Sequence, residues 1–287
     1  MVSMTVDLDG TLHYLDYGGS GPPLVCIHGL GGSAINWLAV GSALARNHHV
    51  LAPDLPGFGH SPLEGRSAGL GANQELLDRF LQEVAGTPAV LVGNSMGAML
   101  ALLQSLRRPE TVRALALVNP AVPWSGRHHF DLRVWDFFGS LTTPRAAGQR
   151  ATWRTRRTDA ARLVDEALAV VCARPDRVTP DLVEAHIEQV MDRRHSNGHH
   201  DPVLVQAGRS LIRALARRGQ EELYGGVRAP VLVVHGERDR LVPLESSLTL
   251  AQRYGWLVMV LPGVGHVPML EAPGEFLKAL EPWLDTV

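Results

Sequence analysis

Short apolar runs rich in Val and Leu recur along the chain, and amphipathic stretches separate them. Apolar runs without polar alternation are typical of strands buried on both faces of a sheet. The stretches between them carry apolar residues at helical spacing, as Leu76, Leu77 and Phe80 do within 72–85. Strands that alternate with helices predict a parallel sheet built by right-handed crossovers. The strands predicted in this way are 23–27, 49–52, 88–92, 112–118, 229–234 and 257–261.

The first residues follow a different pattern. Residues 4–9 and 12–16 alternate between apolar and polar, and Asp9-Gly10-Thr11 joins them. Alternation on both sides of such a turn predicts an antiparallel hairpin. Together with the six buried runs, the hairpin predicts an eight-stranded, mostly parallel sheet. The helices expected between and after the strands are 34–45, 72–85, 98–107, 244–254 and 274–284.

The alternation of strand and helix patterns stops between residues 121 and 226. Buried-strand runs are absent from this sequence, which reads as helical and Arg-rich. We therefore predict an α/β core formed by 1–120 and 227–287, with a helical insertion at 121–226. Within the insertion, 203–218 is amphipathic. Its expected apolar side consists of Val205, Leu211, Ile212 and Leu215.

The stretch Gly93-Asn94-Ser95-Met96-Gly97 stands where an apolar strand pattern passes into a helical one. A Gly-x-Ser-x-Gly turn between a strand and a helix is a nucleophile elbow. Its glycines remove side chains that would collide with neighbouring backbone. The turn presents Ser95 at the helix N-terminus, where developing negative charge is favoured. We predict that Ser95 is a nucleophile.

Two loops near the end of the chain follow predicted strands. Asp239 lies in the loop 235–243, and His266 lies in the loop 262–271. The carboxyl ends of parallel strands meet at one edge of a sheet, where open α/β sheets place their sites. Ser95, Asp239 and His266 are therefore expected to come together, in that chain order.

These three residue types suit nucleophilic catalysis. A serine hydroxyl is a poor nucleophile at neutral pH, so His266 would take its proton and later return it to the leaving group. Asp239 would hold the tautomer of the imidazole and stabilise its charged form. Glu237 and Asp54 are rival acids, but Asp239 lies deepest in its loop and is preferred.

A developing oxyanion needs hydrogen-bond donors. The Met96 N–H directly follows the nucleophile, and the loop His28-Gly29-Leu30-Gly31 offers a second donor at the Leu30 N–H. We interpret His28 as a structural histidine that bridges loop backbones. The expected substrate contacts are Leu30, Met96, Trp124 and Val267.

Composition narrows the class of protein. The chain has 287 residues, 45% of them hydrophobic, which is enough for a sizeable core, and a net charge of −2 gives no reason to expect a nucleic-acid partner. Cys26 and Cys172 stand in strand and helix patterns, so two buried thiols are expected rather than a disulfide. No apolar run reaches about 18 residues, so we expect no membrane span and a cytoplasmic location.

No cofactor or metal is expected. His195, His199 and His200 with Asp201 are close in sequence, but they lack the fixed spacing of a ligand set. The expected partner is a small-molecule ester substrate, and the sequence leaves a homodimer open.

The chain resembles the α/β-hydrolase fold over essentially its whole length. The resemblance rests on the order and spacing of His28–Gly31, Asp54–Ser61, Gly93–Gly97, Asp239 and Gly265-His266. The resemblance implies a mostly parallel eight-stranded sheet flanked by helices. It also implies that the insertion after strand six is a helical cap that roofs the site and selects the substrate. Residues 121–226 stand in that place.

The identity of the nucleophile limits which reactions of this fold are expected. Haloalkane dehalogenases and epoxide hydrolases of this fold use an Asp nucleophile, which Ser95 disfavours. Residues 93–97 resemble the C–C hydrolases of meta-cleavage products, yet those usually follow the catalytic His with Trp, where this chain has Val267. The run His266-Val267-Pro268-Met269-Leu270-Glu271 looks more like that of the esterases. This resemblance implies hydrolysis of a carboxylic ester with a small-to-medium, mostly apolar substrate through an acyl-enzyme. A C–C hydrolase, a cofactor-free perhydrolase or haloperoxidase, an acyl-transfer tailoring enzyme and a ligand receptor on the same fold are the alternatives.

Overall fold

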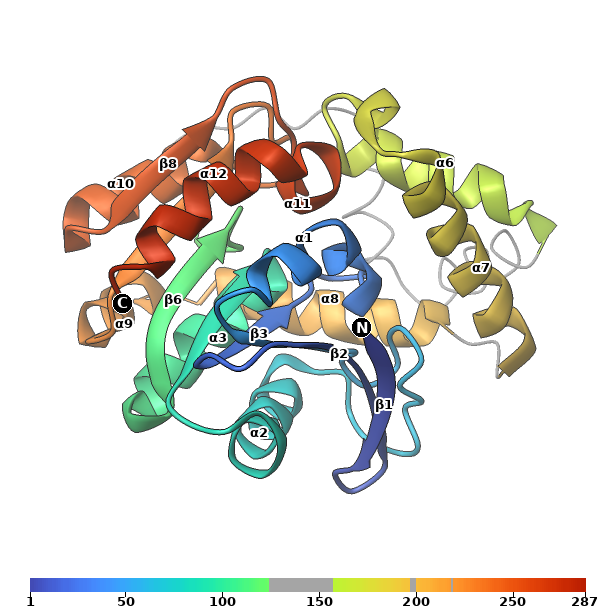
Figure 1. Ribbon diagram of the computed structural model, residues 1–287, viewed down its shortest axis with the longest axis horizontal. Coiled ribbons are helices and arrows are strands. Elements are labelled where there is room, and N and C mark those ends of the chain that lie inside the picture. The colour runs from blue at the N-terminus through green and yellow to red at the C-terminus, as the bar shows by residue number, and fades with distance from the viewer. Residues whose placement is uncertain (124–156, 197–199, 218) are drawn as a thin grey trace.

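The computed structural model describes residues 1–123, 157–196, 200–217 and 219–287. Its centre is an eight-stranded sheet with the strand order β1-β2-β4-β3-β5-β6-β7-β8 (Figure 1). β1 and β2 form the predicted antiparallel hairpin, β2 also runs antiparallel to β4, and all other neighbours are parallel. The strands are β1 Val2–Asp7, β2 Thr11–Gly18, β3 Pro23–Ile27, β4 His49–Pro53, β5 Ala89–Asn94, β6 Val112–Val118, β7 Val231–Gly236 and β8 Leu257–Leu261.

The bounds of β7 differ from the prediction of 229–234. The strand begins at Val231, which pairs with Leu115 of β6. Pro230 has no N–H to donate to the ladder, so regular pairing starts one residue later. At the other end, the strand continues to Gly236 and carries His235 to the edge of the sheet, directly before the loop of Asp239.

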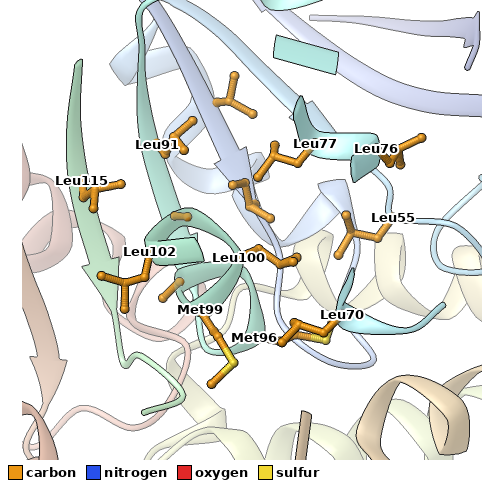
Figure 2. Packing of buried hydrophobic residues seen from close by; sticks show 14 of the residues in the cluster. Leu55, Leu70, Leu76, Leu77, Leu91, Met96, Met99, Leu100, Leu102 and Leu115 are labelled. Carbon is orange, nitrogen blue, oxygen red and sulfur yellow. The ribbon is translucent and has the colours of Figure 1, made fainter. Parts of the chain in front are cut away.

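Alternate residues of the central strands enter two separate cores. In β3, Val25 and Ile27 face one core, while Leu24 and Cys26 face the other. Helices α2 (Leu70–Phe80) and α3 (Met96–Arg107) close the first core, whose packing is seen in Figure 2. Helices α1 (Leu38–Leu44) and α12 (Pro273–Leu284) close the second. Both faces of the central strands are therefore covered, as buried parallel strands require, whereas the edge strands β1 and β8 are mostly exposed.

Several helices begin or end away from their predicted bounds. The expected helix 34–45 consists of a 3-10 turn, Ala34–Trp37, followed by α1. The expected helix 72–85 is α2 followed by a π-helical turn, Leu81–Ala85. The remaining helices of the core are α10 Leu244–Tyr254 and α11 Pro268–Glu271, and a 3-10 turn covers Pro109–Thr111.

Between β6 and β7, the described residues form helices and no strand. They are α6 Ala160–Val171, α7 Pro180–Ser196, α8 His200–Leu215 and α9 Gln220–Leu223, with 3-10 turns at Pro175–Arg177 and Tyr224–Gly226. Figure 1 shows α6 and α7 side by side at one end of the molecule. Trp124 lies outside the described residues. The division at 121 and 226 stays a prediction.

The predicted apolar side of α8 was partly wrong. Val203, Ala207 and Leu211 are its buried residues, whereas Val205 and Ile212 are only partly buried. The helix is held against α2 through Ser210, whose Oγ accepts a hydrogen bond from the Leu70 N–H. The side of α8 that faces the core therefore follows a four-residue repeat and differs from the side chosen from hydrophobicity alone.

Three compositional expectations bear on the described residues. Cys26 and Cys172 are both free and buried, as predicted. None of the described helices has the length and hydropathy needed to cross a membrane. A search of the described residues finds no group of three His, Cys, Asp or Glu side chains that could hold a metal ion. Of the histidine-rich stretch considered above, His199 lies outside those residues.

Candidate active site

Ser95 occupies the tight turn between β5 and α3. Its φ of 55° lies in the left-handed region, which is strained for a residue with a side chain. The turn is anchored to the neighbouring strand β6, because the Ser95 N–H donates to the Val118 carbonyl at 2.9 Å. A Cβ at Gly97 would collide with the Ile27 carbonyl, and one at Gly93 would collide with Gly97. The two glycines are therefore required by close backbone approach.

His266 and Asp239 form a buried pair. The His266 Nδ1–H donates to Asp239 Oδ2 at 2.7 Å, so the neutral ring keeps Nε2 free to accept a proton. The other carboxylate oxygen, Oδ1, accepts the N–H groups of Leu241 at 2.8 Å and Val242 at 3.1 Å. Burial alone would raise the pKa of Asp239, but His266 and the other donors hold it below its ordinary value. The Asp239 carboxylate is therefore ionised near neutral pH, and its negative charge can stabilise a protonated imidazole at His266.

Two further side chains surround the carboxylate of Asp239. The Asn119 Nδ2–H donates to Oδ2 at 2.6 Å, and His235 Nε2 lies 3.6 Å from the same oxygen. His235 Nε2–H donates to the Val242 carbonyl at 3.2 Å. Asn119 has a φ of 46°, a backbone conformation that Asn tolerates better than most residues. These side chains fix the position of the acid from the side opposite to its loop.

Sequence reasoning missed both of these residues. Asn119 is 120 positions from Asp239, and their contact arises only because β6 and β7 are neighbours in the sheet. One signal was available: Asn119 directly follows β6 at the sheet edge that carries the site. His235 ends β7, four residues before Asp239.

The rival acids are engaged elsewhere. Asp54 is fully buried, and its carboxylate accepts hydrogen bonds from His13 Nδ1 at 2.7 Å and from the backbone N–H groups of Ala34 and His60. Glu237 accepts the Gly263 N–H at 2.9 Å at the surface. Asp54 joins β2 and the start of the 3-10 turn at Ala34 to its own loop, and Asp239 is the acid that meets His266.

His28 bridges loop backbones, which confirms the structural interpretation. Its Nδ1–H donates to the Gly29 carbonyl at 2.7 Å, and its Nε2 accepts the Leu55 N–H at 3.0 Å. The ring is fully buried, and burial lowers its pKa although Asp54 opposes the shift. A neutral ring is the form that can make both bonds at once.

The expected oxyanion donors have free amides. In the described part of the chain, the N–H groups of Leu30 and Met96 donate to no acceptor. Leu30 lines a cavity together with Ser95 and His266. The Met96 side chain is buried in the first core (Figure 2), and Met96 is not among the described residues that line the cavity. Val267 also lines the cavity.

The cavity has a volume of about 860 Å³, in the range of small-molecule sites. Its walls come from both parts of the chain. The core contributes the turn of Ser95 and the loop after β3, while α6, α7 and α8 supply the opposite walls. Most of the surface is aliphatic, with side chains that include Leu163, Leu168, Leu204, Leu211, Leu215 and Leu270.

A buried carboxylate ties the loop of His266 to the end of α6. Glu271 accepts the N–H groups of Gly265 at 2.8 Å, Ala173 at 3.1 Å and Arg174 at 2.7 Å. The His266 N–H itself donates to the Val171 carbonyl at 2.7 Å. His266 and one wall of the cavity therefore share a single hydrogen-bond network.

Burial lowers the pKa of four histidines, namely His28, His48, His186 and His235, and this makes stability dependent on pH. Burial lowers the pKa of His28 and His235 below 6.5, although Asp54 and Asp239 oppose it. Below pH 6.5, the unfolded chain therefore binds protons that the folded chain does not. We expect the free energy of unfolding to fall from about pH 7 to about pH 5, by at most about 1.4 kcal/mol per pH unit for each ring. Urea titrations at both pH values measure it, and a constant or rising free energy would contradict the assignment.

Comparison with known proteins shows the family of this chain. The family model of the alpha/beta hydrolase family matches residues 24–279. The chain therefore belongs to the alpha/beta hydrolase family, as its fold and the order of its site residues had indicated. Its sheet is the eight-stranded, mostly parallel sheet of that fold, and its helical insertion follows strand six.

Three relatives illustrate the range of this family. The 2-hydroxymuconate semialdehyde hydrolase of Pseudomonas sp. (strain CF600) is 28% identical over 93% of this chain and 88% of its own. The pimeloyl-[acyl-carrier protein] methyl ester esterase of Nitrosospira multiformis is 25% identical over 92% of this chain and 95% of its own. The solved structure of a bacterial membrane phospholipase A aligns with a TM-score of 0.79 and 26% identity, covering 99% of this chain and 86% of that one. Hydrolysis is common to all three names, whereas the substrates differ.

Proposed function

We propose that this protein is a serine esterase that uses Ser95, His266 and Asp239. The observation that carries the proposal is the hydrogen bond from His266 Nδ1–H to the ionised Asp239, in a cavity that Ser95 also lines. That bond leaves His266 Nε2 as the proton acceptor that a serine nucleophile requires. The free amides of Leu30 and Met96 supply the second requirement, donors for an oxyanion.

The proposed reaction has two halves. Ser95 Oγ attacks the ester carbonyl while His266 Nε2 takes its proton, and the amides of Leu30 and Met96 stabilise the oxyanion. The alkoxide leaves with the proton from His266, which gives an alcohol and an acyl-Ser95 ester. Water then attacks this ester, His266 takes a proton from the water and returns it to Ser95, and the carboxylic acid is released.

The cavity supports a mostly apolar substrate. Its aliphatic walls would bury an acyl chain, and each buried methylene contributes about 0.8 kcal/mol. Helices α6, α7 and α8 supply much of this wall, so we propose that 121–226 acts as a cap that selects the substrate. Val267, beside the base, adds a small aliphatic side chain to the wall.

A series of p-nitrophenyl esters from acetate to decanoate tests the proposal. We expect release of p-nitrophenol with kcat/KM rising with chain length until the cavity is filled. An absence of turnover across the series, or turnover that persists at the same rate in Ser95→Ala, would contradict an esterase.

A C–C bond hydrolase is the second candidate, because one relative is named for a semialdehyde and because residues 93–97 resemble that group. A dienone-type ring-cleavage product distinguishes the two activities through the loss of its colour. Rapid loss of colour, with p-nitrophenyl esters hydrolysed much more slowly, would favour this candidate.

Asn119 is expected to position the acid without touching the substrate. Asn119→Gly removes the amide that donates to Asp239 and tolerates the positive φ of this position. We expect kcat to fall about tenfold, the effect of one hydrogen bond to a charged group, while KM changes little. The pH dependence of kcat should shift with it. Wild-type kcat and an unchanged pH profile in this variant would show that the contact is only structural.

A further inference from the structure

One wall of the cavity is polar and has no role in the reaction proposed above. Gln189 of α7 and Ser33, in the loop after β3, both line the cavity. The Ser33 Oγ–H donates to Gln189 Oε1 at 2.7 Å, and this bond orients the amide. The Gln189 side chain is 7% exposed, and its Nε2 is buried without a hydrogen-bond partner in the described residues. A buried donor left unpaired is costly, so its presence in a cavity indicates a ligand.

His186 adds an acceptor beside this donor. It precedes Gln189 by three residues, so the two side chains share one face of α7, and His186 also lines the cavity. Its Nδ1–H donates to the Leu182 carbonyl at 2.7 Å, which leaves Nε2 as an acceptor. Burial lowers the pKa of His186, and Arg193 lowers it further, so the ring stays neutral and Nε2 keeps its lone pair.

A donor and an acceptor on the same helix face, three residues apart, limit the chemistry of the ligand. A hydroxyl can accept from the Gln189 Nε2–H and donate to His186 Nε2. A carboxylate or a carbonyl could accept from Gln189 but would meet the lone pair of His186. The nearby cation Arg193 does not change this, because it is not among the residues that line the cavity, and Asp54 faces it.

We propose that Gln189 and His186 form a subsite for a hydroxyl group carried on the acyl chain of the substrate, with Ser33 holding the amide of Gln189 in place. The substrate is then an ester of a hydroxylated, otherwise aliphatic acid. The subsite rests on the proposed esterase only in that the bound molecule is the ester. It provides selectivity, since plain acyl chains would leave the amide unpaired.

Binding to the Ser95→Ala protein tests the subsite without turnover. Calorimetry compares methyl esters of plain alkanoic acids, from butanoate to octanoate, with their ω-hydroxy counterparts. The measured quantity is the ratio of the Kd of the plain ester to the Kd of its hydroxylated counterpart. At the chain length that reaches α7, we expect this ratio to be about tenfold larger with Gln189 present than in a Gln189→Leu background. A tenfold difference is what one hydrogen bond in a dry site provides. Comparing ratios between backgrounds cancels the difference in hydration of the two esters.

Two more variants complete the test. Gln189→Met keeps the length of the side chain and should abolish the preference as Gln189→Leu does. Gln206→Leu, the same change on an exposed position of α8 outside the cavity, should retain it. Equal ratios in all backgrounds and at every chain length, or no binding of either ester, would overturn the subsite.

Hydrolysis by the wild-type protein separates this proposal from the proposed function. If the same esters are bound with the expected preference but none is hydrolysed, the subsite stands and the esterase assignment fails. If plain and hydroxylated esters are bound and hydrolysed alike, the esterase stands and the subsite fails.

Discussion

Replacing Ser95 with alanine is expected to lower kcat by about 10⁵-fold or more, since the nucleophile, base and acid act as one unit. The variant keeps the amides of Leu30 and Met96, so residual activity should come only from binding and polarisation of the ester. His266→Ala should fall to a similar level, because a serine without its base is no longer activated. Steady-state hydrolysis of p-nitrophenyl butyrate measures both.

The chain offers a matched control for this variant. Ser105 is buried on α3, the helix that begins after Ser95, and its Oγ has no hydrogen-bond partner in the described residues. Ser105→Ala removes a hydroxyl from the same helix, outside the cavity, and should keep wild-type kcat and equal or higher stability. A Ser95→Ala protein that is folded and retains more than about a hundredth of wild-type kcat would contradict its role as the nucleophile.

Asp239→Asn is expected to lower kcat by about 10⁴-fold with little change in shape. The amide oxygen would accept the N–H groups of Leu241 and Val242, as Oδ1 does now. The amide NH₂ would then face His266 Nδ1 and force the ring proton onto Nε2. A ring in that tautomer cannot take the proton of Ser95.

The same substitution should also affect folding, to a smaller extent. The new NH₂ would meet the Asn119 Nδ2–H, and the free energy of unfolding should fall by about 1–3 kcal/mol for the lost acceptor. Urea titration measures this term separately from kcat. Glu237→Gln is the control, since Glu237 lies two residues upstream and bonds Gly263 at the surface, and its kcat should stay within about twofold of wild type. Full activity in Asp239→Asn would show that the acid is misassigned.

The core of the fold was accessible from local sequence. The strands β3 and β6 have the bounds that their apolar runs predicted, because a strand buried on both faces leaves a continuous signal. The bounds of β8 were also predicted from its apolar run, although most of this edge strand is exposed. The face of α8 was less accessible, because its rotation is set by contacts such as the bond from Leu70 to Ser210, 140 positions apart. Local hydrophobicity contains no information about such a partner.

In the candidate site too, some residues could be placed from local sequence and others could not. Ser95, Asp239 and His266 follow strand ends, and strand ends of one sheet edge are brought together by topology alone. The residues that hold this region in place make contacts with partners far away in the sequence, so the sequence alone does not reveal them. Asn119 meets Asp239 across 120 positions, Glu271 meets Ala173 across 98, and Ser33 meets Gln189 across 156. The shared position of these three residues at one sheet edge could therefore be predicted from motifs, whereas the contacts that support them required the folded chain.

Reaction with a fluorophosphonate, followed by mass spectrometry of the digested protein, tests the central claim most directly. Such a reagent phosphonylates a serine that a neighbouring histidine activates, and it requires no knowledge of the substrate. We predict one adduct per chain, on the peptide that carries Ser95, with labelling abolished in His266→Ala and slowed in Asp239→Asn. An unlabelled protein, an adduct on another residue, or equal labelling of the His266→Ala variant would contradict the account.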